Sequence, residues 1–183
     1  NMYNNGTQWI KHTERLKEWL SNQISLNPTI VDIGCGDGSF LSSMANQYNF
    51  KGNFLGFDPS GNFNEERAPI SFNRSLFKPL EDTANYKPDL IVMRHVIEHL
   101  NAPSSFLHSL VWAASSYKKQ TYLYCEVPCI DRVFETGRLS DFYYEHPSQF
   151  TTSSFTKMLT TSGRVVDIHH VYGGEVICGL IEL

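Results

Sequence analysis

The sequence of 183 residues lacks the features that mark membrane, secreted and nucleic-acid-binding proteins. No apolar run approaches the ~20 residues that cross a bilayer, and no basic segment followed by an apolar one opens the chain as a signal peptide would. Basic side chains number 15 against 19 acidic ones, and no dense Lys/Arg run is present. Charge therefore gives no case for nucleic acid or an anionic membrane as partner, and we expect a small-molecule ligand.

Cysteine is scarce as well. The four cysteines form no paired CxxC knuckles and lack the density of a secreted disulfide scaffold. We expect reduced thiols, mostly buried as small hydrophobes, and a cytoplasmic location. The length and an apolar content of 41% suit one compact domain spanning residues 1–183. Because Asn1 precedes Met2, the chain either carries an added residue or is a domain cut from a longer protein.

Short apolar segments alternate with helical ones along most of the chain. Strands are expected at 29–33, 54–57, 70–72, 90–93, 121–127, 164–171 and 175–183, and helices at 9–24, 39–48, 103–117 and 155–162. This alternation predicts a parallel sheet covered by helices on both faces, closed by an antiparallel hairpin at the last two strands. Residues 129–150 break the rhythm and are expected to form an irregular insertion near a functional site.

A glycine-rich turn lies between the first strand and the helix after it. It reads Asp32-Ile33-Gly34-Cys35-Gly36-Asp37-Gly38. Glycine is needed where φ is positive or where a ligand approaches the backbone, and the following helix offers free N–H groups at its start. Asp58 ends the next strand, 24 residues after Gly34, where a carboxylate suits the two hydroxyls of a ribose.

This turn resembles the first motif of class I S-adenosylmethionine methyltransferases. The segments 89–93 and 95–100 are similar to that family's fourth strand and the stretch after it, so that the resemblance covers about residues 8 to 183. It implies a three-layer Rossmann-like α/β fold with about seven strands, S-adenosylmethionine as cofactor and S-adenosylhomocysteine as product. It also implies that the cofactor contacts Asp32, Gly34, Cys35, Gly36, Gly38, Asp58, Pro59, Leu76, Arg94 and His95.

Other interpretations of the glycine turn are a purely structural bend, an NAD-binding oxidoreductase and a module that binds the cofactor without catalysis. Dinucleotide loops read G-x-G-x-x-G, whereas this one reads G-x-G-x-G and has Asp32 before its first glycine. A non-catalytic module would be expected to lose the loop or the ribose acid, and both are intact. The sequence therefore favours an enzyme.

A second motif, His95-Val96-Ile97-Glu98-His99, matches the H-x-x-E-H pattern of one class of zinc peptidase. Two histidines one helical turn apart suit zinc, but the motif lies where the resemblance places a strand-to-helix junction, and no third ligand is evident. We expect no metal. Glu98 and His99 are interpreted as local hydrogen-bonding groups, while His95 follows the carboxyl end of a central strand, the edge at which ligands bind.

The stretch 142–150 combines aromatic, acidic and histidine side chains. Methyl transfer to a hydroxyl or a carbon acid needs a base, and histidine titrates near neutrality. The stretch resembles the Tyr-x-Glu-His segment of sugar C-methyltransferases that act on nucleotide-linked 4-keto-hexoses, as do Glu-x-Pro at 126–128 and the turn at 172–174. By that resemblance His146 removes the proton beside the ketone, and Tyr143 and Glu145 assist.

The full enzymes of that group carry an amino-terminal zinc-binding region and a further carboxyl-terminal domain. Neither is present in these 183 residues, so the sugar nucleotide itself is left open. We expect methyl transfer to a small, carbohydrate-like acceptor at carbon or oxygen, with other domains of a larger protein as further partners. The alternatives are a natural-product or lipid-like acceptor methylated at oxygen or nitrogen, and a surface loop in which His146 is incidental.

Overall fold

The computed structural model describes residues 6–63, 70–137 and 146–183, and its strands form one sheet of seven in the order β3-β2-β1-β4-β5-β7-β6. Strands β1 to β5 run parallel, while β7 is antiparallel to both β5 and β6. The predicted parallel sheet with a closing antiparallel hairpin is therefore confirmed. The strands are β1 (Thr29–Ile33), β2 (Asn53–Phe57), β3 (Ile70–Asn73), β4 (Leu90–Arg94), β5 (Tyr122–Pro128), β6 (Arg164–Val171) and β7 (Val176–Glu182).

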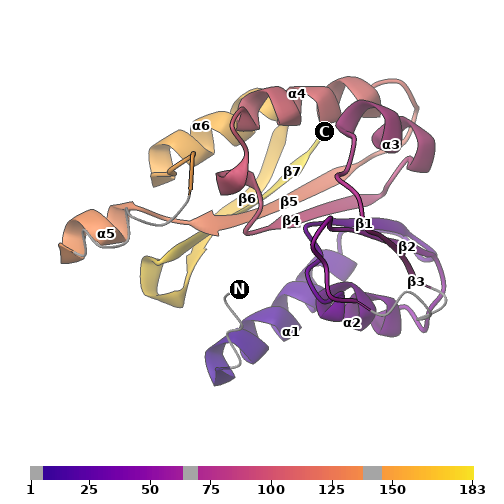
Figure 1. Cartoon of the computed structure of the whole chain (residues 1–183), viewed down its shortest axis with the longest axis horizontal. Helices are drawn as coiled ribbons and strands as arrows, with labels where there is room; N and C mark the ends of the chain where they lie inside the picture. Colours follow the sequence, from indigo (N-terminus) through magenta and orange to yellow (C-terminus); the bar gives the residue numbers. More distant parts are fainter. Residues whose placement is uncertain (1–5, 64–69, 138–145) are drawn as a thin grey trace.

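Helices cover both faces of the sheet and give the three expected layers (Figure 1). On one face lie α1 (Thr7–Ser21) and α2 (Ser39–Gln47). On the other lie α3 (Pro79–Tyr86), α4 (Pro103–Ala114) and α6 (Thr152–Ser162). The short α5 (Asp131–Thr136) extends beyond the end of β5, and two single turns, η1 (Ile97–His99) and η3 (Tyr172–Gly174), follow β4 and β6.

Each face of the sheet has its own apolar core, because successive strand side chains point to opposite faces. In β1, Ile30 packs with the cluster that contains Leu20 of α1, whereas its neighbour Val31 belongs to the cluster that contains Leu107 of α4. All five residues of β1 are buried, which matches a central parallel strand covered on both sides. The run of consecutive apolar residues in the sequence reflects this double coverage.

Two helices differ from the sequence prediction. Helix α3 was not predicted, because Thr83 is its one buried residue and no apolar stripe marks it. Its start depends on local chemistry instead: Pro79 occupies the first turn, and Asp82 Oδ2 accepts a hydrogen bond from Lys78 N at 2.7 Å. Within the segment expected to be irregular, 129–150, residues Asp131–Thr136 form α5, so that prediction is wrong for this part.

The order of the strands reverses between β1 and β4, which pair directly. The connections that follow the carboxyl ends of these two strands therefore diverge. Ligands of open α/β sheets bind in the crevice between such connections. The glycine turn follows β1 at this place, and the segment from His95 to His99 follows β4. The fold thus brings together the two motifs that the sequence singled out.

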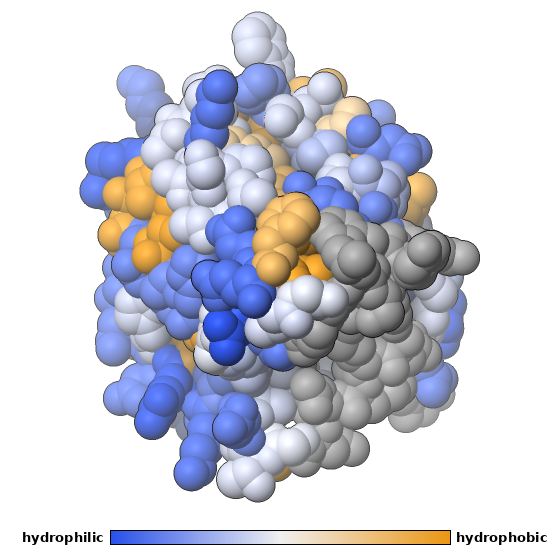
Figure 2. Space-filling model, turned by 90° about the vertical axis from the view of Figure 1, so that its left-hand side faces the viewer, coloured by the Kyte–Doolittle hydropathy of each residue, from blue (hydrophilic) through white to orange (hydrophobic). Residues whose placement is uncertain are grey.

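The face of the molecule drawn in Figure 2 is mostly hydrophilic, and apolar residues form small separate patches on it. Among the described helices none has the length and apolar content needed to cross a lipid bilayer. All four cysteines are buried free thiols, as expected.

Candidate active site

The glycine turn after β1 is held in shape by the end of β2. Gly34 N and Cys35 N both donate to the carbonyl of Phe57, at 2.7 and 3.3 Å. Gly34 has a φ of 73°, and a Cβ at this position would lie 2.3 Å from Cγ2 of Val96, so both conformation and space demand glycine. Gly36 also has a positive φ, of 59°, but a Cβ there would meet no atom of the described residues within 4 Å. Its backbone therefore borders open space that a ligand can fill.

Asp58 lies beside this turn, where the sequence placed it. Its Oδ2 accepts a hydrogen bond from Gly36 N at 2.9 Å, and its Oδ1 accepts one from Ser60 N at 2.9 Å. A carboxylate oxygen accepts more than one hydrogen bond, so both oxygens can still receive the hydroxyls of a ribose. Pro59 is exposed, and Leu76, the other residue predicted at this end, is 74% exposed.

Cys35 and Gly38 shape the turn through their backbones. Gly38 N donates to the carbonyl of Cys35 at 2.9 Å, and a Cβ on Gly38 would lie 2.4 Å from the ring of Phe72. The Cys35 side chain is buried, and its Sγ lies 2.8 Å from the Cβ position that Gly56 of β2 leaves empty. Burial raises the pKa of the Cys35 thiol well above its usual range, and this side chain is a neutral packing group.

Asp32, near the end of β1, is a buried acidic residue beside the turn. Its side chain is 3% exposed, and this burial raises the pKa of the carboxyl to about 7. Arg94 opposes the shift, whereas Asp58 and Asp37 add to it. A cation bound at this place would relieve the cost of burying the carboxylate, because an opposite charge favours the ionised form.

Arg94, at the end of β4, supplies a positive charge in the same crevice. Its guanidinium carbon lies 4.6 Å from the ring centroid of Trp9 and 4.7 Å from that of Phe40, so the group is held between two aromatic rings. Its Nε forms an ion pair with Glu126 Oε2 at 3.5 Å, whereas its Nη2 is buried and has no hydrogen-bond partner in the described part of the chain. Donors left unpaired in this way are expected where a ligand supplies the acceptor.

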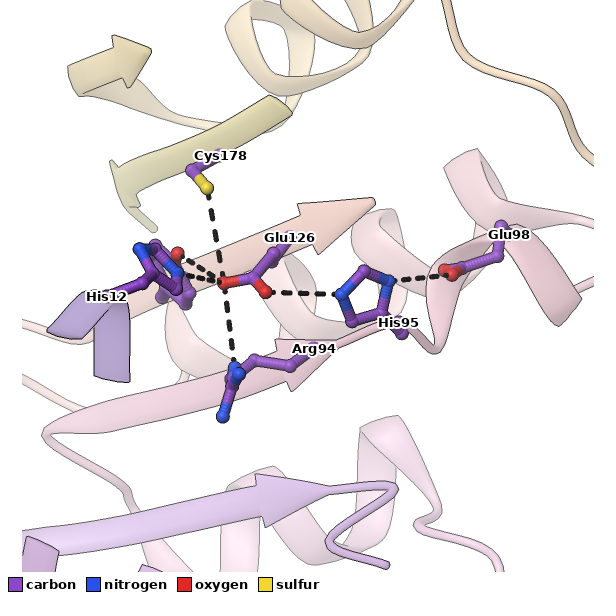
Figure 3. Close-up of polar contacts among 7 residues, drawn as sticks. His12, Arg94, His95, Glu98, Glu126 and Cys178 are labelled. Carbon is purple, nitrogen blue, oxygen red and sulfur yellow. Dashed lines mark hydrogen bonds and ion pairs between the residues drawn. The ribbon is translucent and has the colours of Figure 1, made fainter. Parts of the chain in front are cut away.

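A buried carboxylate, Glu126 on β5, joins α1 to the ends of β4 and β5 (Figure 3). Its Oε2 accepts a hydrogen bond from the Tyr124 hydroxyl at 2.8 Å, lies 3.0 Å from His12 Nε2 and forms an ion pair with Arg94 Nε at 3.5 Å. Burial would raise the pKa of Glu126, but His12, His95 and Arg94 together hold it well below its usual range. Glu126 is therefore an ionised carboxylate with no exposed surface.

His95 lies between two carboxylates at the same edge (Figure 3). Its Nε2 is 3.2 Å from Glu126 Oε1, and its Nδ1 is 3.5 Å from Glu98 Oε1. Burial would lower the pKa of His95, but the two carboxylates raise it to about 9. The residue also has a φ of 53°, a strained conformation for a side chain with a Cβ. The structure places His95 at the predicted edge as a fixed imidazolium cation.

His146 packs against the turn η1. Its ring centroid is 4.7 Å from that of His99, and the ligand atoms of Glu98, His99 and His146 all lie within 4.8 Å of one another. Ser148 N donates to the Glu98 carbonyl at 3.1 Å and fixes this segment to the turn. Burial lowers the pKa of His146, Glu98 opposes the shift, and His99 and His95 add to it. A neutral imidazole therefore lies near the end of β4.

The structure adds two residues of α1 that the sequence did not indicate as site residues. His12 contacts Glu126, and Trp9 covers Arg94 and stacks on Tyr172 with ring centroids 5.9 Å apart. The helical spacing marked Trp9 as a core residue, and nothing local distinguished His12. Tyr143 and Glu145, the predicted helpers of His146, lie outside the described residues, so their roles stay predictions.

The H-x-x-E-H segment does not form the helix of a zinc peptidase. Residues 97–99 make a single 3-10 turn, and His95 precedes it in a left-handed conformation, so the two histidines do not share a helical face. A second group with close ligand atoms, consisting of His12, Glu126 and Cys178, is joined by hydrogen bonds to the Glu126 carboxylate. The absence of a metal stays a prediction.

Together these features define a class of protein. A sheet with the order β3-β2-β1-β4-β5-β7-β6, a glycine turn after β1 and an acid after β2 constitute the Rossmann-like fold of S-adenosylmethionine-dependent methyltransferases. Residues 5–167 match the family described as methyltransferase domain, and the chain belongs to that family. It is an S-adenosylmethionine-dependent methyltransferase. No curated protein sequence matches the chain.

Solved methyltransferase structures share this fold. The plantazolicin methyltransferase BpumL, in complex with a triazolic desmethyl analogue and S-adenosylhomocysteine, has a TM-score of 0.70 at 17% identity, over 98% of this chain and 86% of that one. A methyltransferase from Archaeoglobus fulgidus has a TM-score of 0.64 at 14% identity, over 97% and 95%. The magnesium protoporphyrin IX methyltransferase of Synechocystis PCC 6803, with bound S-adenosylhomocysteine, has a TM-score of 0.64 at 14% identity, over 94% and 82%.

The side chains present fit the cofactor of this family. Open space borders Gly36, and Asp58 beside it has acceptor capacity for a diol. Arg94 has one buried donor, Nη2, without a hydrogen-bond partner in the described ranges, and Asp32 is a buried carboxyl group that a cation would favour in its ionised form. The amino-acid tail of S-adenosylmethionine carries one carboxylate and one ammonium, which match these two groups in charge.

Proposed function

We propose that this methyltransferase acts on a small, carbohydrate-like acceptor, at carbon or oxygen, with His146 as the general base. The observation that carries the proposal is the position of His146 against η1, at the edge of the sheet where β4 ends. Burial lowers its pKa, which favours the neutral form that a base needs near pH 7. The resemblance of 142–150 to sugar C-methyltransferases supports the same role.

In this proposal the cofactor lies over the turn from Gly34 to Gly38, including the backbone of Cys35. Asp58 receives the ribose hydroxyls of the cofactor, and Pro59 and Leu76 lie beside its adenine ring. Arg94 binds the carboxylate of the amino-acid tail and Asp32 its ammonium, while His95 borders the same tail. When bound, S-adenosylmethionine supplies an electrophilic methyl group and is converted to S-adenosylhomocysteine.

The chain's own part in the reaction is to align the acceptor and to move one proton. His146 takes the proton from an acceptor hydroxyl or from a carbon next to a carbonyl. The electron pair left on the acceptor forms the bond to the methyl carbon, and the carbon–sulfur bond breaks with its electrons going to sulfur. Tyr143 and Glu145 assist by orienting the imidazole, which afterwards loses its proton to water.

The test is His146→Ala, assayed with S-adenosylmethionine and a nucleotide-linked 4-keto-hexose. Because a positioned base contributes about 10²–10⁴-fold, turnover should fall by that factor while calorimetry shows unchanged affinity for S-adenosylhomocysteine. His108→Ala is the matched control, since His108 is an exposed histidine on α4. Full activity of His146→Ala would remove His146 from the mechanism.

A second acceptor class is favoured by one observation. Trp9 and Tyr172 stack at the edge of the site with planes 16° apart, a surface that suits an aromatic or lipid-like molecule methylated at oxygen or nitrogen. The plantazolicin methyltransferase of similar fold is bound to an azolic analogue. Product analysis by NMR, with a panel of both acceptor classes, separates the two candidates by the atom that is methylated.

Charge and thiol chemistry support the remaining parts of the proposal. A balance of 15 basic against 19 acidic side chains favours a small acceptor over nucleic acid or a membrane surface. Four buried free thiols favour a reducing compartment and hence a cytoplasmic location. Other domains of a larger protein stay a proposed partner.

A further inference from the structure

We propose that Glu98 is a positioning residue that orients His146 and stabilises its protonated form during methyl transfer. The inference rests on the proposed role of His146 as base. Glu98 is 2% exposed and has its two oxygens in different surroundings. Oε1 lies 3.5 Å from His95 Nδ1, whereas Oε2 is buried and has no hydrogen-bond partner in the described ranges.

A buried carboxylate oxygen without a hydrogen-bond donor is unfavourable. We therefore expect a neighbouring group to donate a hydrogen bond to this oxygen. The nearest candidates are two imidazoles, since the ligand atoms of Glu98, His99 and His146 lie within 4.8 Å of one another. Of these two, His146 is the partly buried one and His99 is exposed. A ring nitrogen of His146 thus lies within 4.8 Å of a Glu98 carboxylate oxygen.

The His146 imidazole can supply the donor that Oε2 lacks, before and after it takes the substrate proton. A neutral imidazole that donates one N–H to Glu98 presents its other nitrogen, as an acceptor, to the substrate proton, so the carboxylate selects the useful tautomer. Once His146 has taken that proton it is a cation, and a carboxylate within a few ångströms stabilises it. The proton itself stays on His146, and Glu98 acts by orientation and charge.

Charged and titratable side chains on the elements that pack against Glu98 support this role. His95, at the end of β4, is a cation held by Glu126 of β5, and it offsets the cost of burying the Glu98 carboxylate. His99 and His146 face the other side. Charges therefore alternate along the line from Glu126 through His95 and Glu98 to His146, the last of which becomes positive during the reaction.

The experiment compares Glu98→Gln and Glu98→Asp with Glu81→Gln, an exposed carboxylate of α3 with 66% of its side chain accessible. NMR titration of isotope-labelled histidines measures the pKa of His146 without any acceptor. We expect Glu98→Gln to lower this pKa, because the carboxylate that opposed the effect of burial is gone. We expect Glu98→Asp to restore part of the shift, and Glu81→Gln to change nothing.

Rates with S-adenosylmethionine and a nucleotide-linked 4-keto-hexose give the second measurement. Loss of an orienting carboxylate costs about 10²–10⁴-fold in kcat, so Glu98→Gln should fall in this range and its acid limb of kcat/KM should move to lower pH. In the His146→Ala background the same substitution should have no further effect, because Glu98 acts through His146. Cofactor affinity should stay at the wild-type value throughout.

Several outcomes would overturn the inference. An unchanged His146 titration in Glu98→Gln, or equal titrations in the Gln and Asp variants, would mean that Glu98 has a packing role only. Loss of activity on chelation, restored by Zn²⁺ or Mn²⁺, would mean that Glu98, His99 and His146 serve a metal instead. Full activity of His146→Ala would refute the proposed base. This failure is distinguishable from failure of the Glu98 inference, because the histidine titration does not depend on turnover.

Discussion

Two alanine substitutions in the glycine turn should differ in their main effect, with the larger loss of stability at Gly34 and a loss of cofactor binding at Gly36. Gly34 and Gly36 both have positive φ, at 73° and 59°, where alanine costs about 1–2 kcal/mol. At Gly34 the new Cβ would also lie 2.3 Å from Cγ2 of Val96, a stiff side chain, and such overpacking adds about 1–3 kcal/mol. Gly34→Ala should therefore lower the free energy of unfolding by about 2–5 kcal/mol, and Gly36→Ala by about 1–2 kcal/mol.

Thermal unfolding and calorimetric titration together test this reasoning. In a domain of this size each kcal/mol lowers Tm by about 2–4 °C, so Gly34→Ala should lower Tm by about 10 °C and Gly36→Ala by about 4 °C. In Gly36→Ala the new methyl group enters the open space assigned to the cofactor. A clash of about 1–3 kcal/mol there should weaken the binding of S-adenosylhomocysteine about tenfold to a hundredfold.

Gly137→Ala supplies the matched control for the backbone effect. Gly137 ends α5 with a φ of 67°, and a Cβ there would meet no atom of residues 6–63, 70–137 and 146–183 within 4 Å, as at Gly36. This variant should reproduce the stability loss of Gly36→Ala and leave the binding of S-adenosylhomocysteine unchanged. Unchanged affinity in Gly36→Ala would place the cofactor elsewhere, and equal losses of Tm at Gly34 and Gly36 would show that Val96 moves aside without cost.

Two further predictions concern the charged groups. Asp58→Asn removes the charge offered to the ribose, and since a hydrogen bond to a charged group contributes about 1.5–3 kcal/mol, calorimetry should show roughly tenfold to hundredfold weaker binding of S-adenosylhomocysteine. Wild-type affinity in this variant would exclude Asp58 from the site. The second prediction concerns stability against pH: the pKa of His95 is raised from 6.5 to about 9, so its contribution, about 3 kcal/mol, is complete below pH ~6.5 and is lost as the pH rises through ~9. His95→Gln should flatten this fall in Tm, and a fall of equal size in the variant would contradict the assignment.

The sheet was predictable because its signals are local. Strand β1 has the predicted bounds, since five buried residues lie between Pro28 and Gly34. The antiparallel pair β6 and β7 was visible for a similar reason, as two apolar runs flank Gly173-Gly174. Helix α3 was missed because one buried residue gives no periodic pattern. Its proline and its capping aspartate were the available signals.

The residues of the candidate site also divide into those with a local sequence signal and those without one. The turn at 34–38 and Asp58 are local motifs with a known spacing, and the structure joins them by one hydrogen bond. The contact between His12 and Glu126 spans 114 residues of sequence, and no periodicity encodes it. The useful signal was a charged residue inside an apolar strand, because a carboxylate at that position must find partners from other elements.

The buried charges at this edge are explained better by chemistry than by stability. Replacing a buried ionic group by apolar side chains of similar volume is often neutral or stabilising, so stability alone does not explain a buried carboxylate such as Glu126. His95 adds a strained φ, and Arg94 adds a buried donor, Nη2, that has no hydrogen-bond partner in the described part of the chain. These costs concentrate where β4 and β5 end. The proposed function, in which this site binds a zwitterionic tail and moves a proton, offers a reason for these costs.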